Sequence, residues 1–155
     1  MDYTVRPIAY IRNDRSEALD DNWDEIVSTV ELAQDVPGEA LRGLQDFSHV
    51  EIVFFADWAE DVPPGPWHRR PRGNAKWPDI GVFAQRNKDR PNRLLLSTVE
   101  IDELSERSFT ARGLDGIDGT PVFDINRSFV GACRRASSVW RRGAKSSARA
   151  TSSSR

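Results

Sequence analysis

Residues 114–125 read LDGIDGTPVFDI, a turn rich in glycine and aspartate that leads into a short apolar segment. Glycine and aspartate tolerate the backbone angles of tight turns, so Asp118-Gly119-Thr120 is expected to introduce a strand over residues 121–125. Before this stretch, further short apolar segments follow one another along the chain, with Gly or Pro residues between them. Closely spaced short strands of this kind are typical of an all-β barrel or sandwich.

The sequence predicts about seven strands and very little helix. The clearest strand covers residues 47–56, which are nearly all apolar after Glu51 and therefore covered on both faces. Residues 26–32 are rich in β-branched side chains and predict a strand, with a short helix as the alternative. Further strands are expected over residues 3–11, 81–84, 94–101 and 108–112. Residues 37–43 predict one or two helical turns, and the five prolines of residues 61–78 predict a long irregular loop.

The chain has 155 residues, of which 38% are hydrophobic and 30% charged, as in one soluble globular domain. We expect a single mainly-β domain over residues 1–133, with one short helix and long loops. Residues 134–155 carry seven Lys or Arg and no acid, so they predict a basic tail that is disordered or that holds a polyanion. With one cysteine, no secretory signal and no long apolar run, a cytoplasmic protein without a membrane span is expected.

Two polar clusters are candidates for chemistry. Residues 69–93 hold eight Lys or Arg, and arginine forks suit carboxylates and phosphates, although a solvated basic face would have the same composition. In the second cluster, residues 113–121, Asp115 and Asp118 can accept hydrogen bonds from hydroxyls or amines, although an ordinary tight turn would also explain the pattern. Neither spacing fits a P-loop or a Rossmann fingerprint. The two histidines and Cys133 lack metal-ligand spacing, so no metal is predicted.

Three motifs in a fixed order resemble one protein family. They are LRGLQDFSHV at residues 41–50, then PRG, GVFAQR and RPN between residues 71 and 92, then LDGIDGTPVFDI. Together they are similar to the TrmO-like, or TsaA-like, family over residues 3–126. The resemblance implies a β-barrel, a homodimer and a methyltransferase that uses S-adenosylmethionine. The best-known family activity is N6-methylation of the threonylcarbamoyladenosine at tRNA position 37, so tRNA is an expected partner.

The resemblance also implies where the ligands bind. Two groups of residues are expected to contact the cofactor. The first group is carried over from the family by position, and the second is the pair Asp57 and Trp58, which follows the strand predicted over residues 47–56. They are Arg86, Leu96, Asp115, Gly116, Ile117, Asp118, Asp57 and Trp58. By the same resemblance, Arg72, Arg90 and Asn92 are expected to contact the acceptor. No catalytic residue is named, because methyl transfer is an in-line displacement whose reactivity comes largely from the activated donor.

The chain departs from the family pattern in three places. Gln85 and Asn87 flank the motif arginine where the family usually has Thr and Ser, and residues 93–95 read RLL in place of Pro-Ile-Gly. Residues 126–128 read NRS where the family usually has Lys-Pro-Tyr. These departures leave two alternatives to tRNA methylation: a methyltransferase with a small-molecule acceptor, or a non-catalytic S-adenosylmethionine-binding module.

Overall fold

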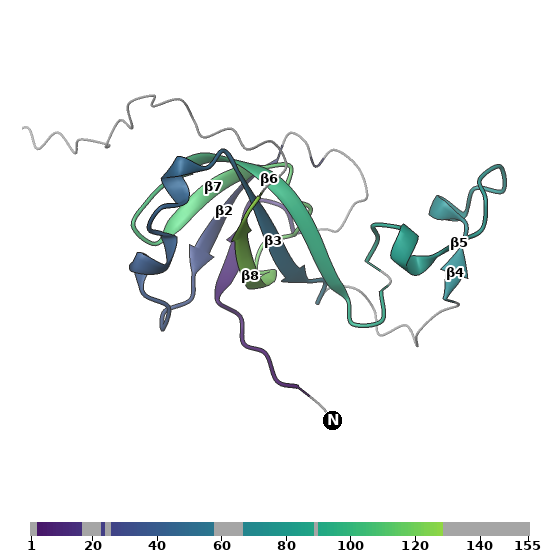
Figure 1. Ribbon diagram of the computed structural model, residues 1–155, viewed down its shortest axis with the longest axis horizontal. Coiled ribbons are helices and arrows are strands. Elements are labelled where there is room, and N and C mark those ends of the chain that lie inside the picture. The colour runs from purple at the N-terminus through teal and green to yellow at the C-terminus, as the bar shows by residue number, and fades with distance from the viewer. Residues whose placement is uncertain (1–2, 17–22, 24–25, 58–66, 89, 129–155) are drawn as a thin grey trace, which may run out of the picture.

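The computed structural model describes residues 3–16, 23, 26–57, 67–88 and 90–128. Six antiparallel strands close into a barrel in the order β1-β2-β7-β6-β3-β8, with β8 paired back to β1 (Figure 1). Closure leaves none of these strands as an open edge, which confirms the predicted mainly-β barrel. The strands are β1 (Ala9–Arg12), β2 (Val27–Leu32), β3 (His49–Phe55), β6 (Leu94–Leu104), β7 (Ser108–Arg112) and β8 (Pro121–Arg127).

A smaller unit between β3 and β6 stands away from the barrel (Figure 1). It is built on the antiparallel pair of β4 (His68–Arg69) and β5 (Ile80–Gly81), with two 3-10 helices, η3 (Pro71–Gly73) and η4 (Val82–Ala84). We call residues 67–92 the arm. The arm rejoins the barrel at Arg93, whose backbone oxygen accepts a hydrogen bond from the Ala56 nitrogen at 3.0 Å.

The barrel core forms because side chains on each strand alternate between its inside and its outside. Along β3 every second residue is buried, and Val50, Ile52 and Phe54 are fully enclosed. Their neighbours on the other strands follow the same period of two, which is the period of a strand with one face on a core. The buried cluster includes Ile11, Val30, Ile101, Phe109 and Val122, one or more from each remaining strand.

The connections gather at two ends of the barrel. Residues 33–48, with η1 (Gly38–Leu41) and η2 (Leu44–Asp46), lie at the end where β2 stops and β7 starts. The other end holds the turn after β7, residues 113–120, together with the end of β3 and the start of β6, because Phe55 pairs with Leu94. We call this second end the turn end.

Most of the predicted elements are confirmed, and three are wrong in part: those at residues 3–11, 81–84 and 61–78. Within residues 26–32 the structure forms the strand β2 from Val27 and not the alternative helix, and the helical turns predicted at residues 37–43 appear as η1. The predicted strand at residues 3–11 starts only at Ala9, since Pro7 has no N–H to donate, and Tyr3 is 84% exposed.

The arm departs furthest from expectation. Residues 81–84 do not form one strand: pairing stops at Gly81, and the chain then turns through η4, which buries Val82. Within residues 61–78, predicted to be irregular throughout, His68 and Arg69 pair with β5. Residues 58–66 and the predicted tail lie outside the described residues. No described helix has the length and apolarity needed to cross a membrane.

Candidate functional site

The turn at residues 113–120 packs into the turn end of the barrel. Leu114 is fully buried and belongs to the barrel core. Gly116 lies so close to Ile11 that a β-carbon at this position would overlap the Ile11 Cδ1 atom. Gly119 has a φ of 84°, in the left-handed region that glycine adopts without strain. Packing and turn geometry therefore account for these two glycines, and the functional argument rests on the aspartates.

Asn13, directly after β1, fixes the position of the turn. Its Nδ2 donates to the Gly116 backbone oxygen at 2.8 Å and to the Ser28 hydroxyl at 2.9 Å. Its backbone nitrogen donates to Asp118 Oδ1 at 3.3 Å. No motif in the sequence points to Asn13, which lies between the strands predicted at residues 3–11 and 26–32. A side-chain amide has two donors, so Asn13 can bind both neighbours at once.

Asp115 faces the inside of the barrel at this end. Its carboxylate accepts a short hydrogen bond from the Ser97 hydroxyl. Ser97 pairs with the buried Ile52, so both side chains lie on the inner face of the sheet. Leu96 is next to Ser97 but on the opposite face, where it is 44% exposed. The structure therefore brings Leu96 and Asp115 to neighbouring positions without placing them on one face.

The remaining barrel residues predicted to bind cofactor share this end. Ile117 is half-buried, and Asp118 is exposed while its nitrogen donates to the Arg15 backbone oxygen at 2.8 Å. Asp57 is exposed two residues beyond β3, and Trp58 lies outside the described residues. Among the described residues, no three His, Cys, Asp or Glu side chains are grouped as metal ligands would be. The exposed and half-buried carboxylates of the turn end can accept hydrogen bonds from a polar ligand.

Two side chains of the arm are used to build the arm itself. Gln85 Nε2 donates to the backbone oxygens of Arg69 at 3.0 Å and Ile80 at 2.9 Å, which ties the segment after η4 to the β4–β5 pair. Arg90 Nη1 donates to the backbone oxygens of Gln85 at 2.9 Å and Val82 at 3.4 Å. Arg90, predicted to contact the acceptor, therefore has a structural role as well.

Arg86 lies in the segment that these bonds hold, and its side chain is exposed. Arg72 and Asn92 are also exposed, and Arg72 has a φ of 50° next to Gly73. Within the part of the chain that the structure describes, we find no contact between Arg86 and the Asp115–Asp118 turn. Within one chain, the carboxylates of Asp115 and Asp118 therefore lie on the barrel, whereas the Arg86 guanidinium lies on the arm.

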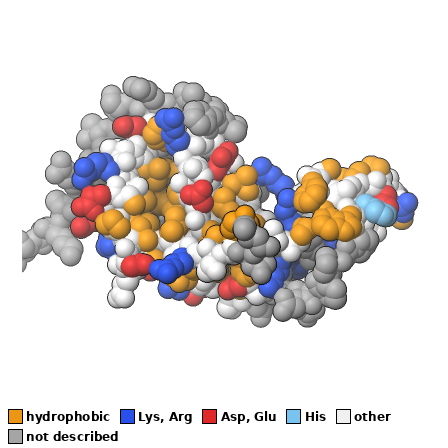
Figure 2. Space-filling view, turned by 60° about the horizontal axis from the view of Figure 1, so that its bottom comes forward, with side chains coloured by type: hydrophobic (Ala, Val, Ile, Leu, Met, Phe, Trp, Pro, Cys, Tyr) orange, Lys and Arg blue, Asp and Glu red, His pale blue; other side chains and the backbone are white. Residues whose placement is uncertain are grey.

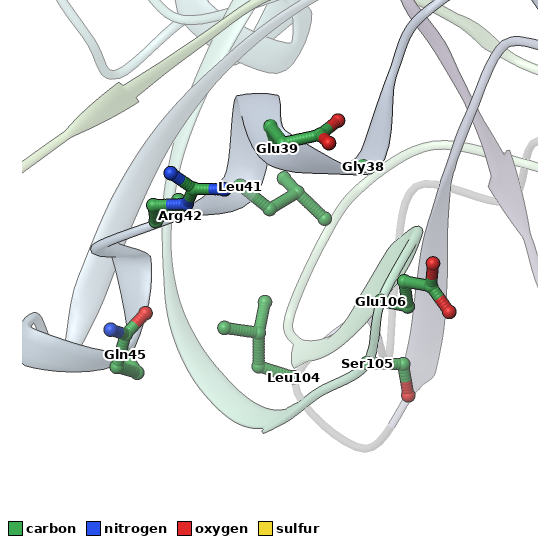
Figure 3. Close-up of a pocket in the computed structure, with 8 residues that line it drawn as sticks. All are labelled: Gly38, Glu39, Leu41, Arg42, Gln45, Leu104, Ser105 and Glu106. Atoms are coloured by element: carbon green, nitrogen blue, oxygen red, sulfur yellow. The ribbon is translucent and has the colours of Figure 1, made fainter.

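A depression of about 350 Å³ lies at the other end of the barrel, between η1, η2 and the β6–β7 connection (Figure 3). Leu41 and Leu104 face one another across it, while the Glu106 carboxylate points away. Gln45, also on its wall, uses its amide oxygen to accept from the Gly43 nitrogen at 2.9 Å. Five of its eight lining residues are polar or charged, but the motif aspartates lie at the turn end, which is therefore the better candidate for a functional site.

Comparisons with known proteins point to one family. Residues 20–132 match the tRNA-methyltransferase O N-terminal domain. The chain is 40% identical over 93 residues to the tRNA (adenine(37)-N6)-methyltransferase of Escherichia coli, covering 56% of this chain and 38% of that protein. It is 33% identical over 134 residues to a probable S-adenosyl-L-methionine-binding protein of Methanothermobacter thermautotrophicus, covering 81% and 89%.

The fold is also similar to that of a solved structure. The crystal structure of TrmO from Pseudomonas aeruginosa matches with a TM-score of 0.65 and 30% identity, covering 90% of this chain and 60% of that one. The chain thus spans less than two thirds of the length of the E. coli protein and of the P. aeruginosa structure.

Proposed function

This chain belongs to the family of tRNA-methyltransferase O N-terminal domains, and from that membership we propose that it is an S-adenosylmethionine-dependent methyltransferase. The proposed acceptor is N6 of the threonylcarbamoyladenosine at tRNA position 37. The relative in E. coli is named as a methyltransferase of adenine 37 in tRNA, and the methanogen relative as a cofactor-binding protein. The proposed location is the cytoplasm, which suits a tRNA substrate and a chain with one cysteine.

The proposal depends on one observation: the acidic turn at residues 115–118 is held in a fixed position at the turn end of the barrel by hydrogen bonds to Asn13. S-adenosylmethionine has an ammonium group, ribose hydroxyls, a carboxylate and an adenine. The residues present fit those groups, because Asp115 and Asp118 accept hydrogen bonds and Arg86 donates them. The half-buried Ile117 supplies apolar surface for the adenine, whereas the exposed Leu96 lies on the outer face of β6 and would reach a ligand only at the edge of this site. Asp57 offers a further carboxylate at the same end, whereas Gly116 is buried and shapes the turn, with its backbone oxygen bonded to Asn13.

In this proposal the chain's own residues contribute by orienting the bound cofactor. S-adenosylmethionine, when bound, supplies a methyl group activated by the sulfonium. Asn13 and Ser97 hold the turn and the Asp115 carboxylate in place before any ligand arrives, so little reorganisation is needed on binding. The closed barrel beneath the turn, filled by Leu114, keeps water from that side of the site. We assign no general base.

We also propose that the protein acts as a homodimer, in which the arm of one copy brings Arg86 to the turn of the other. Two observations support this arrangement. Arg86 is held in the arm by the Gln85 and Arg90 hydrogen bonds, away from its own turn. In addition, Leu94 and Leu96 are 38% and 44% exposed on the outside of β6, which is apolar surface that a second copy would cover.

At three places the sequence departs from the family pattern, and these departures weaken the case for an RNA acceptor. Several of the residues concerned, however, make local contacts in the structure. Gln85 builds the arm, and Asn87 Nδ2 donates to Gln85 Oε1 at 3.4 Å. The Arg93 guanidinium lies 4.8 Å from the Phe55 ring centroid, and the Arg127 guanidinium lies 5.4 Å from the Phe47 ring centroid. A changed acceptor is therefore not needed to explain them. The small-molecule acceptor and the non-catalytic binding module remain the outcomes to be tested against.

Methyl transfer from radiolabelled S-adenosylmethionine to bulk tRNA tests the acceptor. Label is expected in the modified adenosine fraction after nuclease digestion, and Arg86→Ala should weaken cofactor binding by about 1.5–3 kcal/mol in calorimetry, because a charge-assisted pair is lost. Cofactor binding without label in tRNA, but with a methylated metabolite in an extract, would favour the small-molecule acceptor. Cofactor binding with no methylated product at all would favour the binding module.

A mixing experiment tests the shared site. Arg86→Ala and Asp115→Asn each damage every site of their own homodimer. Random mixing of the two gives about half mixed dimers, each with one intact site of two, so about a quarter of the wild-type high-affinity cofactor sites should return. Calorimetric stoichiometry measures this fraction. If both variants are dimers in sedimentation and no sites return on mixing, the shared site is wrong.

A further inference from the structure

The arm exposes two aromatic rings beside each other. Trp67 is 58% exposed and Phe83 is 73% exposed, and their ring centroids lie 6.1 Å apart at a tilt of 55°. Neither ring belongs to the barrel core or to the proposed cofactor contacts. Large aromatic side chains exposed together mark a binding surface more often than single scattered ones do.

The backbone under this pair is fixed. The Val82 nitrogen donates to the Trp67 oxygen at 3.0 Å, which sets the two ring-bearing segments side by side. The Arg90 guanidinium lies 5.8 Å from the Phe83 ring centroid while it bonds the Gln85 and Val82 oxygens. The rings are therefore presented by a hydrogen-bonded scaffold, with a cation already placed at one of them.

The charge around the rings is opposite to that of the barrel. Residues 67–92 carry seven Lys or Arg against two Asp, and one of those acids, Asp79, is bonded to His68 at 2.8 Å. Residues 1–66 and 93–133 carry eight Lys or Arg against 22 acids. Figure 2 shows hydrophobic side chains gathered on one face of the arm, with Lys and Arg side chains beside them. A polyanion would be repelled by the barrel and attracted by the arm.

We propose that Trp67 and Phe83 form a stacking platform for unpaired RNA bases, with the arginines of the arm holding the adjoining phosphates. The inference rests on the proposed function, which makes RNA the substrate, and adds the surface that receives it. Exposed aromatic faces combined with basic side chains are how proteins bind single-stranded nucleic acid. RNA is favoured over a second copy of this chain because the rings lie among cations that phosphates would pair, whereas a protein interface centre is depleted in charge.

Fluorescence anisotropy with a labelled RNA stem-loop tests the platform, since its unpaired loop offers bases for stacking. Trp67→Ala and Phe83→Ala should each weaken binding about 5-fold to 150-fold, the loss of one stacked base. Phe83→Trp, which keeps a large ring at this position, should retain most of the wild-type RNA affinity that Phe83→Ala loses. A fully paired RNA duplex of the same length should bind more weakly than the stem-loop and respond little to these changes.

Salt dependence separates stacking from charge. Arg70→Ala should lower the slope of log affinity against log salt by about 1, whereas the aromatic variants should leave the slope unchanged. Tyr3→Ala removes an exposed ring outside the arm, and we expect it to bind RNA like the wild type. Calorimetry with S-adenosylmethionine on each variant shows whether the cofactor site is intact.

The outcomes distinguish the inference from the function on which it rests. If wild type binds and methylates RNA and the aromatic variants bind equally well, the platform is wrong and the acceptor stands. If wild type binds cofactor but no RNA, the platform and the tRNA acceptor both fail, while the methyltransferase assignment survives. If the aromatic variants change the sedimentation mass and not the RNA affinity, the rings form a contact between copies and the inference is overturned.

Discussion

Replacing Asn13 by alanine should disturb both the stability of the barrel and the affinity of the proposed cofactor site. The substitution removes the two donors that reach Gly116 and Ser28 at 2.8 and 2.9 Å. A typical hydrogen bond contributes about 0.5–1.5 kcal/mol, and a buried group left without its partner costs about 1–3 kcal/mol. Ser28 is 0% exposed, so water does not replace the lost donor there. We expect the free energy of unfolding to fall by about 1–3 kcal/mol.

Urea denaturation followed by tryptophan fluorescence measures this change. With an m value of about 2 kcal/mol/M, the midpoint should fall by about 0.5–1.5 M at unchanged m. Calorimetry should show weaker S-adenosylmethionine binding, because the turn that holds Asp115 and Asp118 loses its anchor. The matched control is Asn126→Ala, which removes an exposed amide bonded to Asp124 at 2.9 Å. This control should stay within about 0.5 kcal/mol of wild type.

Two combinations of results would contradict this role of Asn13. If Asn13→Ala unfolds at the wild-type midpoint and binds cofactor with wild-type affinity, the amide does not position the turn. If stability falls but affinity is unchanged, Asn13 supports the barrel alone, and the acidic turn is not part of the cofactor site.

Three further predictions follow from single contacts. Gly116→Ala should lower the free energy of unfolding by about 1–3 kcal/mol through overlap with Ile11, and Ile11→Val in the same chain should recover part of that loss in urea denaturation. Gln85→Leu should speed limited proteolysis within the arm without shifting the barrel's urea midpoint, since all three bonds of its side-chain amide lie inside the arm. Ser97→Ala should weaken cofactor binding about 5-fold to 10-fold in calorimetry, because Asp115 loses its donor; an unchanged affinity would contradict that role.

The sequence could predict the barrel because its strands carry their own signals. Residues 47–56 are apolar enough to predict a strand, and the structure forms β3 there, but the expected burial of both faces is wrong, since only every second residue of β3 is buried. Residues 108–112 are flanked by turn residues, and β7 has those same bounds. Strand ends were less predictable, since β6 runs on to Leu104 through a bulge after Ile101 that pairing with β7 creates. Pairing partners, and not local composition, decide where a strand stops.

Only those residues of the candidate site that lie within a sequence motif could be predicted. The aspartates of the turn stand out in the sequence, but Asn13 is about a hundred residues away from Gly116 and Asp118, and nothing local marks it. The structure of the arm could not be predicted for a similar reason. Its two strands are two residues long, too short to show a period, and are held by Gln85 from outside the pair. Such long-range side-chain bonds are visible only in the folded chain.

Barrel closure and the candidate site depend on the same hydrogen bonds. β1 and β8 pair through only two residue pairs, Ala9 with Val122 and Tyr10 with Pro121. Beyond them the contact continues through the turn: the Ile11 nitrogen donates to the Thr120 oxygen at 2.9 Å, and the Gly119 nitrogen to the Ile11 oxygen at 2.8 Å. A ligand that binds the ordered turn therefore also stabilises the closed barrel.

The size of this coupling follows from mass action. A ligand present at one hundred times its dissociation constant stabilises the folded state by about 2.7 kcal/mol. This is close to the upper end of the expected loss in Asn13→Ala, so concentrated cofactor should restore much of that variant's urea midpoint. A ligand bound at the far end, in the depression between Leu41 and Leu104, would also stabilise the folded chain. Its dissociation constant, however, would not depend on Asn13, because among the described residues no hydrogen bond of the turn reaches that end. The dependence of cofactor affinity on Asn13 therefore distinguishes the two ends of the barrel as binding sites.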